Sequence, residues 1–163
     1  MTAEEYAEQV KTELTDTWLP LIYIECILKM RTRSYYFGAP LRKPRVEIQH
    51  TLLGVELKVG PRRLLCPDLA TARYLSVFAR AGCKEVAVPY DITRVSLLAD
   101  ELESSWHRMR LLANHNAAER SDSFKARIHG LLIAKLRGEI AAAGAGTAVP
   151  EFKQSTKQRA QGT

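Results

Sequence analysis

The chain has 163 residues, of which 46% are hydrophobic and 26% charged, and its formal net charge is +6. This composition is typical of a soluble globular protein and excludes a disordered or membrane-embedded chain. The longest apolar run, residues 18–30, is too short to cross a bilayer and contains Glu25 and Lys29, so we expect no membrane partner. The first residues carry no secretory signal pattern, and we expect a cytoplasmic protein.

The first third of the chain predicts one helix, one strand and one loop. Thr2-x-x-Glu5 forms a capping box, and apolar residues at every fourth position predict an amphipathic helix over residues 2–17. A strand or a buried helix would suit residues 20–31, and their β-branched and aromatic density favours a strand. The glycine and two prolines of residues 33–44 predict a loop.

The middle of the chain predicts strands around one helix. Apolar and polar residues alternate over residues 46–49 and 55–59, which predicts two half-exposed strands, and residues 62–66 extend the second strand or add a third. An apolar stripe with helical spacing predicts a helix between Asp68 and Gly82. Asp68 can cap its first turn, and Gly82 suits its C-terminal end. Residues 85–90 then predict a short apolar strand. A helix of this length between two strands is typical of a connection between parallel neighbouring strands.

The last part predicts two helices and a tail. Apolar residues recur with helical spacing from Thr93 onward and again from about Ser123, with the polar residues 114–123 between them. We therefore predict a single α/β (α+β) domain over residues 1–143, with a small mixed sheet, the order αβββαβ and a C-terminal helical hairpin. Residues 144–163 are small, polar and basic, and we predict a flexible tail there.

Positive charge is concentrated in one region. Residues 26–63 hold nine lysines and arginines against two glutamates. Such a region attracts nucleic acid by neutralising phosphates, and aromatic rings within it can stack on unpaired bases. An acidic protein surface would be attracted equally, and a solvated strand face gives the same pattern. The nucleic-acid-binding candidates are Arg31, Arg33, Tyr35, Tyr36, Arg42, Lys43, Arg45, Arg62 and Arg63.

Glu56-x-Lys58 is the candidate catalytic motif. Residues two apart on a strand leave the same face, so the Glu56 carboxylate could hold Mg²⁺ while the Lys58 ammonium offsets charge on a phosphate. Glu47, on the preceding strand, is the candidate second metal ligand. An ordinary strand with a charged outer face produces the same spacing.

Residues 54–90 resemble part of the PD-(D/E)xK nucleases, most closely the archaeal Holliday-junction resolvases. The likeness comprises the E-x-K strand, the following helix and the last core strand, and it includes Arg73, Leu75, Phe78, Ala79, Arg80 and Gly82. It implies an αβββαβ core and Mg²⁺-dependent phosphodiester cleavage, with Glu47, Glu56 and Lys58 in the site. That family places an aspartate on the strand before E-x-K, where this chain has Glu47, so a non-catalytic relative is an alternative.

The sequence thus leads to two hypotheses. The first is a nucleic-acid-interacting protein, whose enzymatic form would be a Mg²⁺-dependent phosphodiesterase. The second is a non-catalytic assembly module that uses the basic segment against an acidic protein partner. A homodimer is compatible with both hypotheses.

Overall fold

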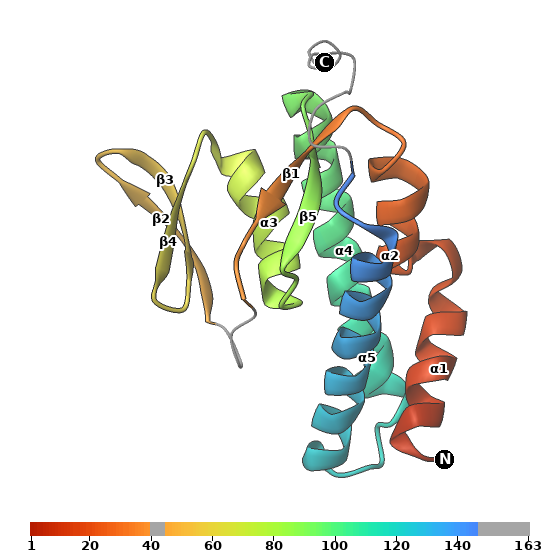
Figure 1. Ribbon diagram of the computed structural model, residues 1–163. Coiled ribbons are helices and arrows are strands. Elements are labelled where there is room, and N and C mark those ends of the chain that lie inside the picture. The colour runs from red at the N-terminus through yellow and green to blue at the C-terminus, as the bar shows by residue number, and fades with distance from the viewer. Residues whose placement is uncertain (40–44, 147–163) are drawn as a thin grey trace.

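The computed structural model describes residues 1–39 and 45–146 (Figure 1). Helices and two small antiparallel sheets make up an α+β fold, which confirms the predicted class. The elements in chain order are α1 (Ala3–Leu14), η1 (Thr15–Thr17), α2 (Leu19–Ile22), η2 (Tyr23–Ile27), β1 (Thr32–Tyr36), β2 (Val46–Thr51), β3 (Gly54–Val59), β4 (Arg62–Cys66), α3 (Leu69–Arg80), β5 (Glu85–Pro89), α4 (Ile92–Asn116) and α5 (Asp122–Ala143).

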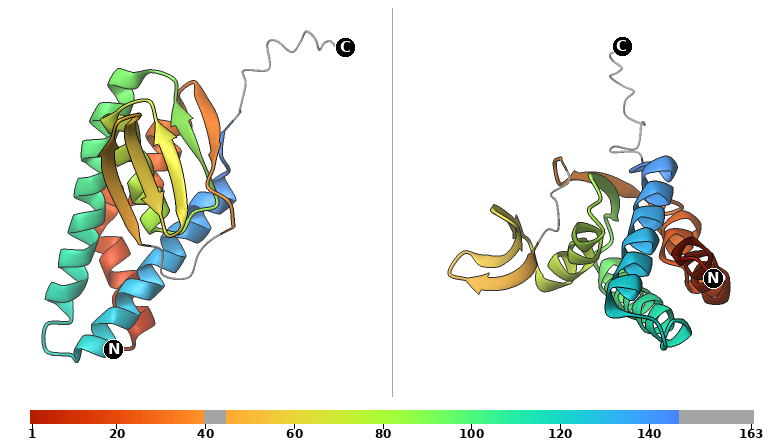
Figure 2. Two further views of the ribbon diagram at one scale, coloured as in Figure 1. Left: turned by 90° about the vertical axis from the view of Figure 1, so that its left-hand side faces the viewer. Right: turned by 90° about the horizontal axis from the view of Figure 1, so that it is seen from below.

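Helices α1, α4 and α5 pack side by side as a bundle (Figures 1 and 2). The capping box of α1 is present, because the Thr2 hydroxyl accepts from the Glu5 amide while the Glu5 carboxylate accepts from the Thr2 amide. Glu139 of α5 ties the bundle to the segment after α1, since its carboxylate accepts from Lys11 Nζ and Trp18 Nε1, both at 2.8 Å. The predicted helical hairpin corresponds to α4 and α5. Within the described residues, no helix is long and apolar enough to cross a membrane.

The strand predicted for residues 20–31 is wrong. The chain there forms the short helix α2 and the π-helical turn η2. Pro20 lies in the first turn of α2, where its missing amide hydrogen costs nothing. Tyr23 and Ile27, four residues apart, are both buried, while Glu25 between them is exposed. This burial has helical spacing, and it overrides the strand propensity of the β-branched residues.

The loop predicted for residues 33–44 is wrong at its start. Thr32–Tyr36 form β1, which pairs antiparallel with β5, so that Thr32 lies opposite Pro89 and Tyr36 opposite Glu85. The two paired segments are about fifty residues apart in the chain, so no local pattern marks β1 as a strand. Residues 40–44 of the expected loop lie outside the described residues.

The remaining strands form a separate sheet rather than a part of one mixed sheet. Strands β2, β3 and β4 make an antiparallel meander in that order, and residues 62–66 are therefore a strand of their own. Helix α3 connects this three-stranded sheet to β5 in the other sheet, so it does not join parallel neighbours. Figure 2 shows α3 between the three-stranded sheet and the helical bundle.

Two buried tyrosines form hydrogen bonds with the edge of β5 that faces away from β1. Ala87 lies opposite Ser34 of β1 in the register, and its backbone groups bond away from β1. Tyr74 donates its hydroxyl to the Ala87 carbonyl at 2.6 Å, and the Ala87 amide donates to the Tyr23 hydroxyl at 2.9 Å. Tyr23 in turn donates to the carbonyl of Gly144 at 2.6 Å, just after α5. The tyrosine hydroxyls thus take the place of a third strand. Of the predicted tail, residues 147–163 lie outside the described residues.

Candidate nucleic-acid interface

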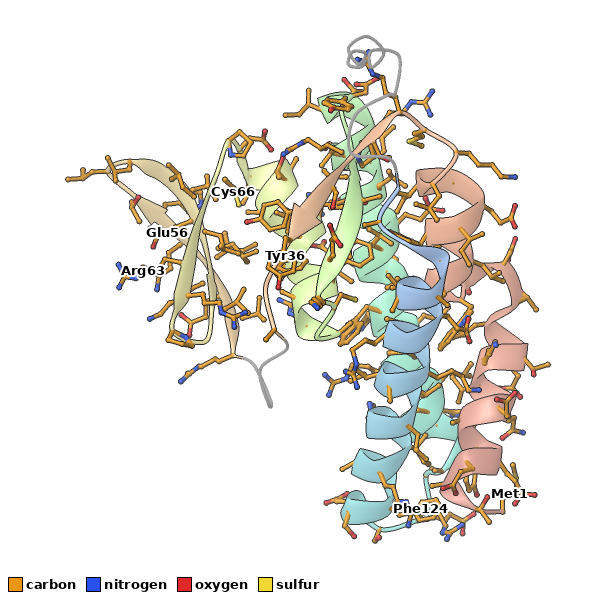
Figure 3. The ribbon with its side chains drawn as sticks, in the orientation of Figure 1. Met1, Tyr36, Glu56, Arg63, Cys66 and Phe124 are labelled. Atoms are coloured by element: carbon orange, nitrogen blue, oxygen red, sulfur yellow. The ribbon has the colours of Figure 1, made fainter. Side chains whose placement is uncertain are left out.

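The three-stranded sheet has an apolar face and a polar face. Leu57, Val59 and Cys66 are buried on the side that packs against α3. Glu56 and Arg63 point away from α3, whereas Cys66 points toward it (Figure 3). The polar outer face is the candidate site, because it carries the E-x-K motif and faces away from the body of the protein (Figure 1).

The strand register brings the charged residues of the outer face together. Lys58 at the centre of the sheet lies opposite Glu47 on one side and opposite Arg63 on the other. The next row of the same face places Glu56 between Gln49 and Leu65. Directly opposite residues of an antiparallel pair share a face, with Cα atoms about 4.5–5.5 Å apart. Glu47, Glu56 and Lys58 therefore share one face, as their spacing predicts.

Each candidate carboxylate has an arginine as its neighbour. The Arg45 Nε lies 3.2 Å from Glu47 Oε2, and the Arg63 Nη1 lies 3.9 Å from Glu56 Oε1. The second distance is too long for a hydrogen bond, and Glu56 Oε1 is buried without a hydrogen-bond partner. The Glu56 side chain is only 14% exposed. Glu56 is thus the partly buried acid of the face, and Glu47 is the more accessible one.

Metal-ligating residues are sparse on this face. In the two described stretches of the chain, no group of three or more His, Cys, Asp or Glu residues could hold a metal ion. Mg²⁺ is commonly held by one or two carboxylates together with waters and substrate phosphates. Glu47 and Glu56 could supply the two carboxylates of such an arrangement, provided that Arg45 and Arg63 release them. The rest of the coordination shell would have to come from waters and the substrate.

Three cations gather at one end of the outer face. Arg45 precedes β2 and its carbonyl accepts from the Gly60 amide at 2.8 Å, which places it beside the β3–β4 turn. Lys58 and Arg63 lie in the adjacent row. Since neighbouring strands are about 4.8 Å apart, the three side chains span about 10 Å across the sheet. Arg45 is 87% exposed along its side chain, so this cationic end, defined as Arg45, Lys58 and Arg63, is accessible to a large ligand.

Arg62 does not belong to the outer face. It alternates with Arg63 along β4, and its Nη1 donates to the Phe37 carbonyl at 2.9 Å. The guanidinium also lies against Gly38, where a Cβ atom would come within 2.9 Å of Arg62 Nη1, and the φ of +101° there independently favours glycine. Arg62 therefore joins the segment after β1 to the three-stranded sheet, and we assign it a structural role.

The remaining candidates lie elsewhere. Arg33, Tyr35 and Tyr36 are on β1, in the two-stranded sheet. Tyr35 packs edge-on against Phe37 at a centroid distance of 5.1 Å, and burial raises the pKa of its hydroxyl, so its ring serves the core. Tyr36 is 60% exposed and remains accessible for stacking.

Arg31 lies over the ring of Tyr90, with its guanidinium carbon 5.1 Å from the ring centroid, at the other end of β1. Arg42 and Lys43 lie outside the described residues. The basic, aromatic segment thus contributes to two sheets rather than to one surface.

Sequence reasoning misses Gln49 on the outer face, and it considers Arg73 only as part of the nuclease likeness. Gln49 shares the outer face with Glu47, and the period-two pattern of β2 is the signal that identifies it. Arg73 instead connects α3 to α4, since its Nη2 lies 2.5 Å from Asp100 Oδ1 and 2.7 Å from Glu103 Oε1. Its conformation is explained by helix packing.

Comparison of the chain with protein-family models, curated proteins and solved structures gave no significant match. The likeness to the PD-(D/E)xK nucleases therefore depends on the residues alone. Along the chain, β4 comes between the E-x-K strand β3 and helix α3. The motif therefore lies on the central strand of the meander.

Proposed function

We propose that the protein binds nucleic acid through the outer face of its three-stranded sheet. The observation that carries the proposal is the convergence of Arg45, Lys58 and Arg63 at one end of this face. Arg42 and Lys43, which lie outside the described residues, come shortly before Arg45 in the sequence. Accessible cations at this spacing can each neutralise a phosphate of a nucleic-acid backbone.

The arrangement of charges on β3 and β4 supports the proposal. Lys58 and Arg63 lie directly opposite each other, and like charges in this position destabilise a sheet. Glu47, the other cross-strand neighbour of Lys58, and Glu56, beside Arg63, offset part of this repulsion. A polyanion bound across the face would offset the remainder, so binding and sheet stability would favour the same occupant.

The test is a salt titration of binding. Labelled single- and double-stranded oligonucleotides are titrated with the wild type and with an Arg45→Gln/Lys58→Gln variant, and binding is followed by fluorescence anisotropy. For each phosphate that the variant no longer neutralises, the slope of log K against log salt should fall by about 0.9 on duplex DNA and about 0.7 on single strands. The matched control is Arg108→Gln/Arg110→Gln, which removes two exposed cations from α4.

The proposal requires that the sheet variant, and not the control, flattens the salt dependence. Equal slopes in all three proteins would contradict it. Absence of any salt-dependent binding would also contradict it, and the same cationic end would then be tested against an acidic protein partner.

A Mg²⁺-dependent nuclease is a second candidate, favoured by the placement of Glu47, Glu56 and Lys58 on one face. The two carboxylates would hold the ion, and Lys58 would offset charge developing on the phosphate. Cleavage of the bound oligonucleotide in Mg²⁺ should then be lost in Glu56→Gln while binding remains. Cleavage that persists in this variant would place the chemistry elsewhere. If the wild type does not cleave the oligonucleotide, the nuclease candidate is rejected and only the binding proposal stands.

A further inference from the structure

A second basic site lies at the opposite end of β1 from the cationic end of the sheet. An open hollow of about 600 Å³ is located where the chain enters β1 and leaves β5, next to the first turn of α4. In Figure 1 this is the upper end of these elements. Among the described residues, Lys29, Arg31, Tyr90, Asp91 and Arg94 line the hollow, and these include three cations and one acid.

The backbone holds two of these residues in place. The Tyr90 amide donates to the Arg31 carbonyl at 3.1 Å, which continues the pairing of β1 with β5. The Arg31 guanidinium lies over the Tyr90 ring, and such cation–π contact restricts its position. A guanidinium whose position is restricted in this way can direct its planar set of donors at a planar or tetrahedral oxyanion. The hollow therefore has a preorganised cationic wall.

Asp91, the acid among the described lining residues, accepts a hydrogen bond as a helix cap. The Asp91 Oδ1 accepts from the Thr93 amide at 3.0 Å, as the N-cap of α4. Lys29 pairs with Glu25 at 3.2 Å, but both side chains are more than half exposed, and exposed pairs of this kind contribute little. The Lys29 charge is thus only weakly compensated by its exposed partner Glu25.

Arg94 lies where its charge opposes the stability of its own helix. It is exposed in the first turn of α4, and the positive end of a helix dipole disfavours a cation there. Among the described residues it forms no ion pair with a carboxylate. An anionic ligand in the hollow would offset both effects.

We propose that this hollow binds a phosphate-bearing ligand, with Arg31, Arg94 and Lys29 around the phosphate and Tyr90 beside the rest of the molecule. Tyr90 is 46% exposed, so part of its ring is open to a ligand group. The volume is within the range of about 300–1,000 Å³ of small-molecule sites. A free nucleotide and the phosphorylated end of a nucleic-acid strand share this chemistry.

The test measures binding of inorganic pyrophosphate and of ATP by isothermal titration calorimetry. Arg94→Glu reverses the charge in the hollow, and it should fold well because an acid in the first turn stabilises a helix. Removal of a charged interaction with the phosphate should weaken binding about tenfold or more. Arg108→Glu is the control, because it makes the same change at an exposed position about 21 Å further along α4.

Weaker binding in Arg94→Glu with unchanged binding in Arg108→Glu would support the site. No binding of either ligand or of a 5′-phosphorylated oligonucleotide to the wild type would overturn it, as would equal effects of the two variants or no effect of Arg94→Glu. Oligonucleotides with a 5′-phosphate and a 5′-hydroxyl identify the source: a strand end is the ligand if only the phosphorylated one depends on Arg94.

The proposals for the hollow and for the sheet surface can be refuted independently, because the sheet test changes Arg45 and Lys58 whereas the hollow test changes Arg94. Loss of salt-dependent binding in the sheet variant with intact pyrophosphate binding would assign the two activities to two sites. A pyrophosphate affinity that falls only in the sheet variant would contradict the proposal that the hollow binds phosphate.

Discussion

The two tyrosine hydroxyls at the edge of β5 should stabilise the protein measurably. Tyr74→Phe removes the donor to the Ala87 carbonyl, and Tyr23→Phe removes the partner of the Ala87 amide together with the bond to Gly144. Both rings are fully buried, and phenylalanine fills the same space apart from the hydroxyl. The expected loss is therefore due to hydrogen bonding alone.

The size of the loss follows from what each substitution leaves behind. A buried group without its partner costs about 1–3 kcal/mol. Tyr74→Phe leaves a carbonyl, whereas Tyr23→Phe leaves a buried amide hydrogen, and orphaned amides are the rarer case in folded proteins. We expect both variants to lose about 1–3 kcal/mol in the free energy of unfolding, with Tyr23→Phe the more destabilised.

Urea unfolding followed by circular dichroism measures these losses, with the denaturant slope as a check that the same surface is exposed on unfolding. Tyr36→Phe is the matched control, because its hydroxyl is on a largely exposed side chain and the change should stay within about 0.5 kcal/mol. Losses below about 0.5 kcal/mol in both buried variants would refute the assignment of the hydroxyls as replacements for a third strand.

Two further predictions concern stability. Burial raises the pKa of Tyr23 and of Cys83 to about 12 each, so the protonated forms stabilise the fold fully below their unfolded values near 10 and 9, and this contribution is lost as pH rises toward 12. Urea midpoints should fall over this window, and less so in Cys83→Ala; an unchanged fall would exclude the thiol as a cause. Asp68→Ala should cost about 1 kcal/mol, because Asp68 Oδ1 accepts from the Thr71 amide at 2.7 Å as the cap of α3. A midpoint equal to the wild type would show that water replaces this cap.

The helices can be predicted because their signals are local. The capping box at Thr2, the cap at Asp68 and the apolar stripes of α4 and α5 each lie within a few turns of the chain. The segment after Pro20 misleads because its residue types favour a strand, whereas burial against the bundle selects a helix. Strand β1 escapes prediction because its stabilising partner, β5, is distant in sequence.

The candidate surface is predictable in part for the same reason. Alternation along β3 places Glu56 and Lys58 on one face, which needs no tertiary information. The inward direction of Arg62 depends on β4 being a separate strand, which the sequence leaves open. The hollow cannot be predicted, since only the pairing of β1 with β5 brings Arg31 to Tyr90 and the start of α4.

The tyrosine-closed edge of β5 also limits what the small sheet can join. An uncovered strand edge is a template on which another chain can add a strand, and this is a route to aggregation. At Ala87 the outward amide and carbonyl are already bonded to Tyr23 and Tyr74, so an incoming strand would find neither a donor nor an acceptor there. Two side chains from distant helices thereby protect a two-stranded sheet against growth along that edge.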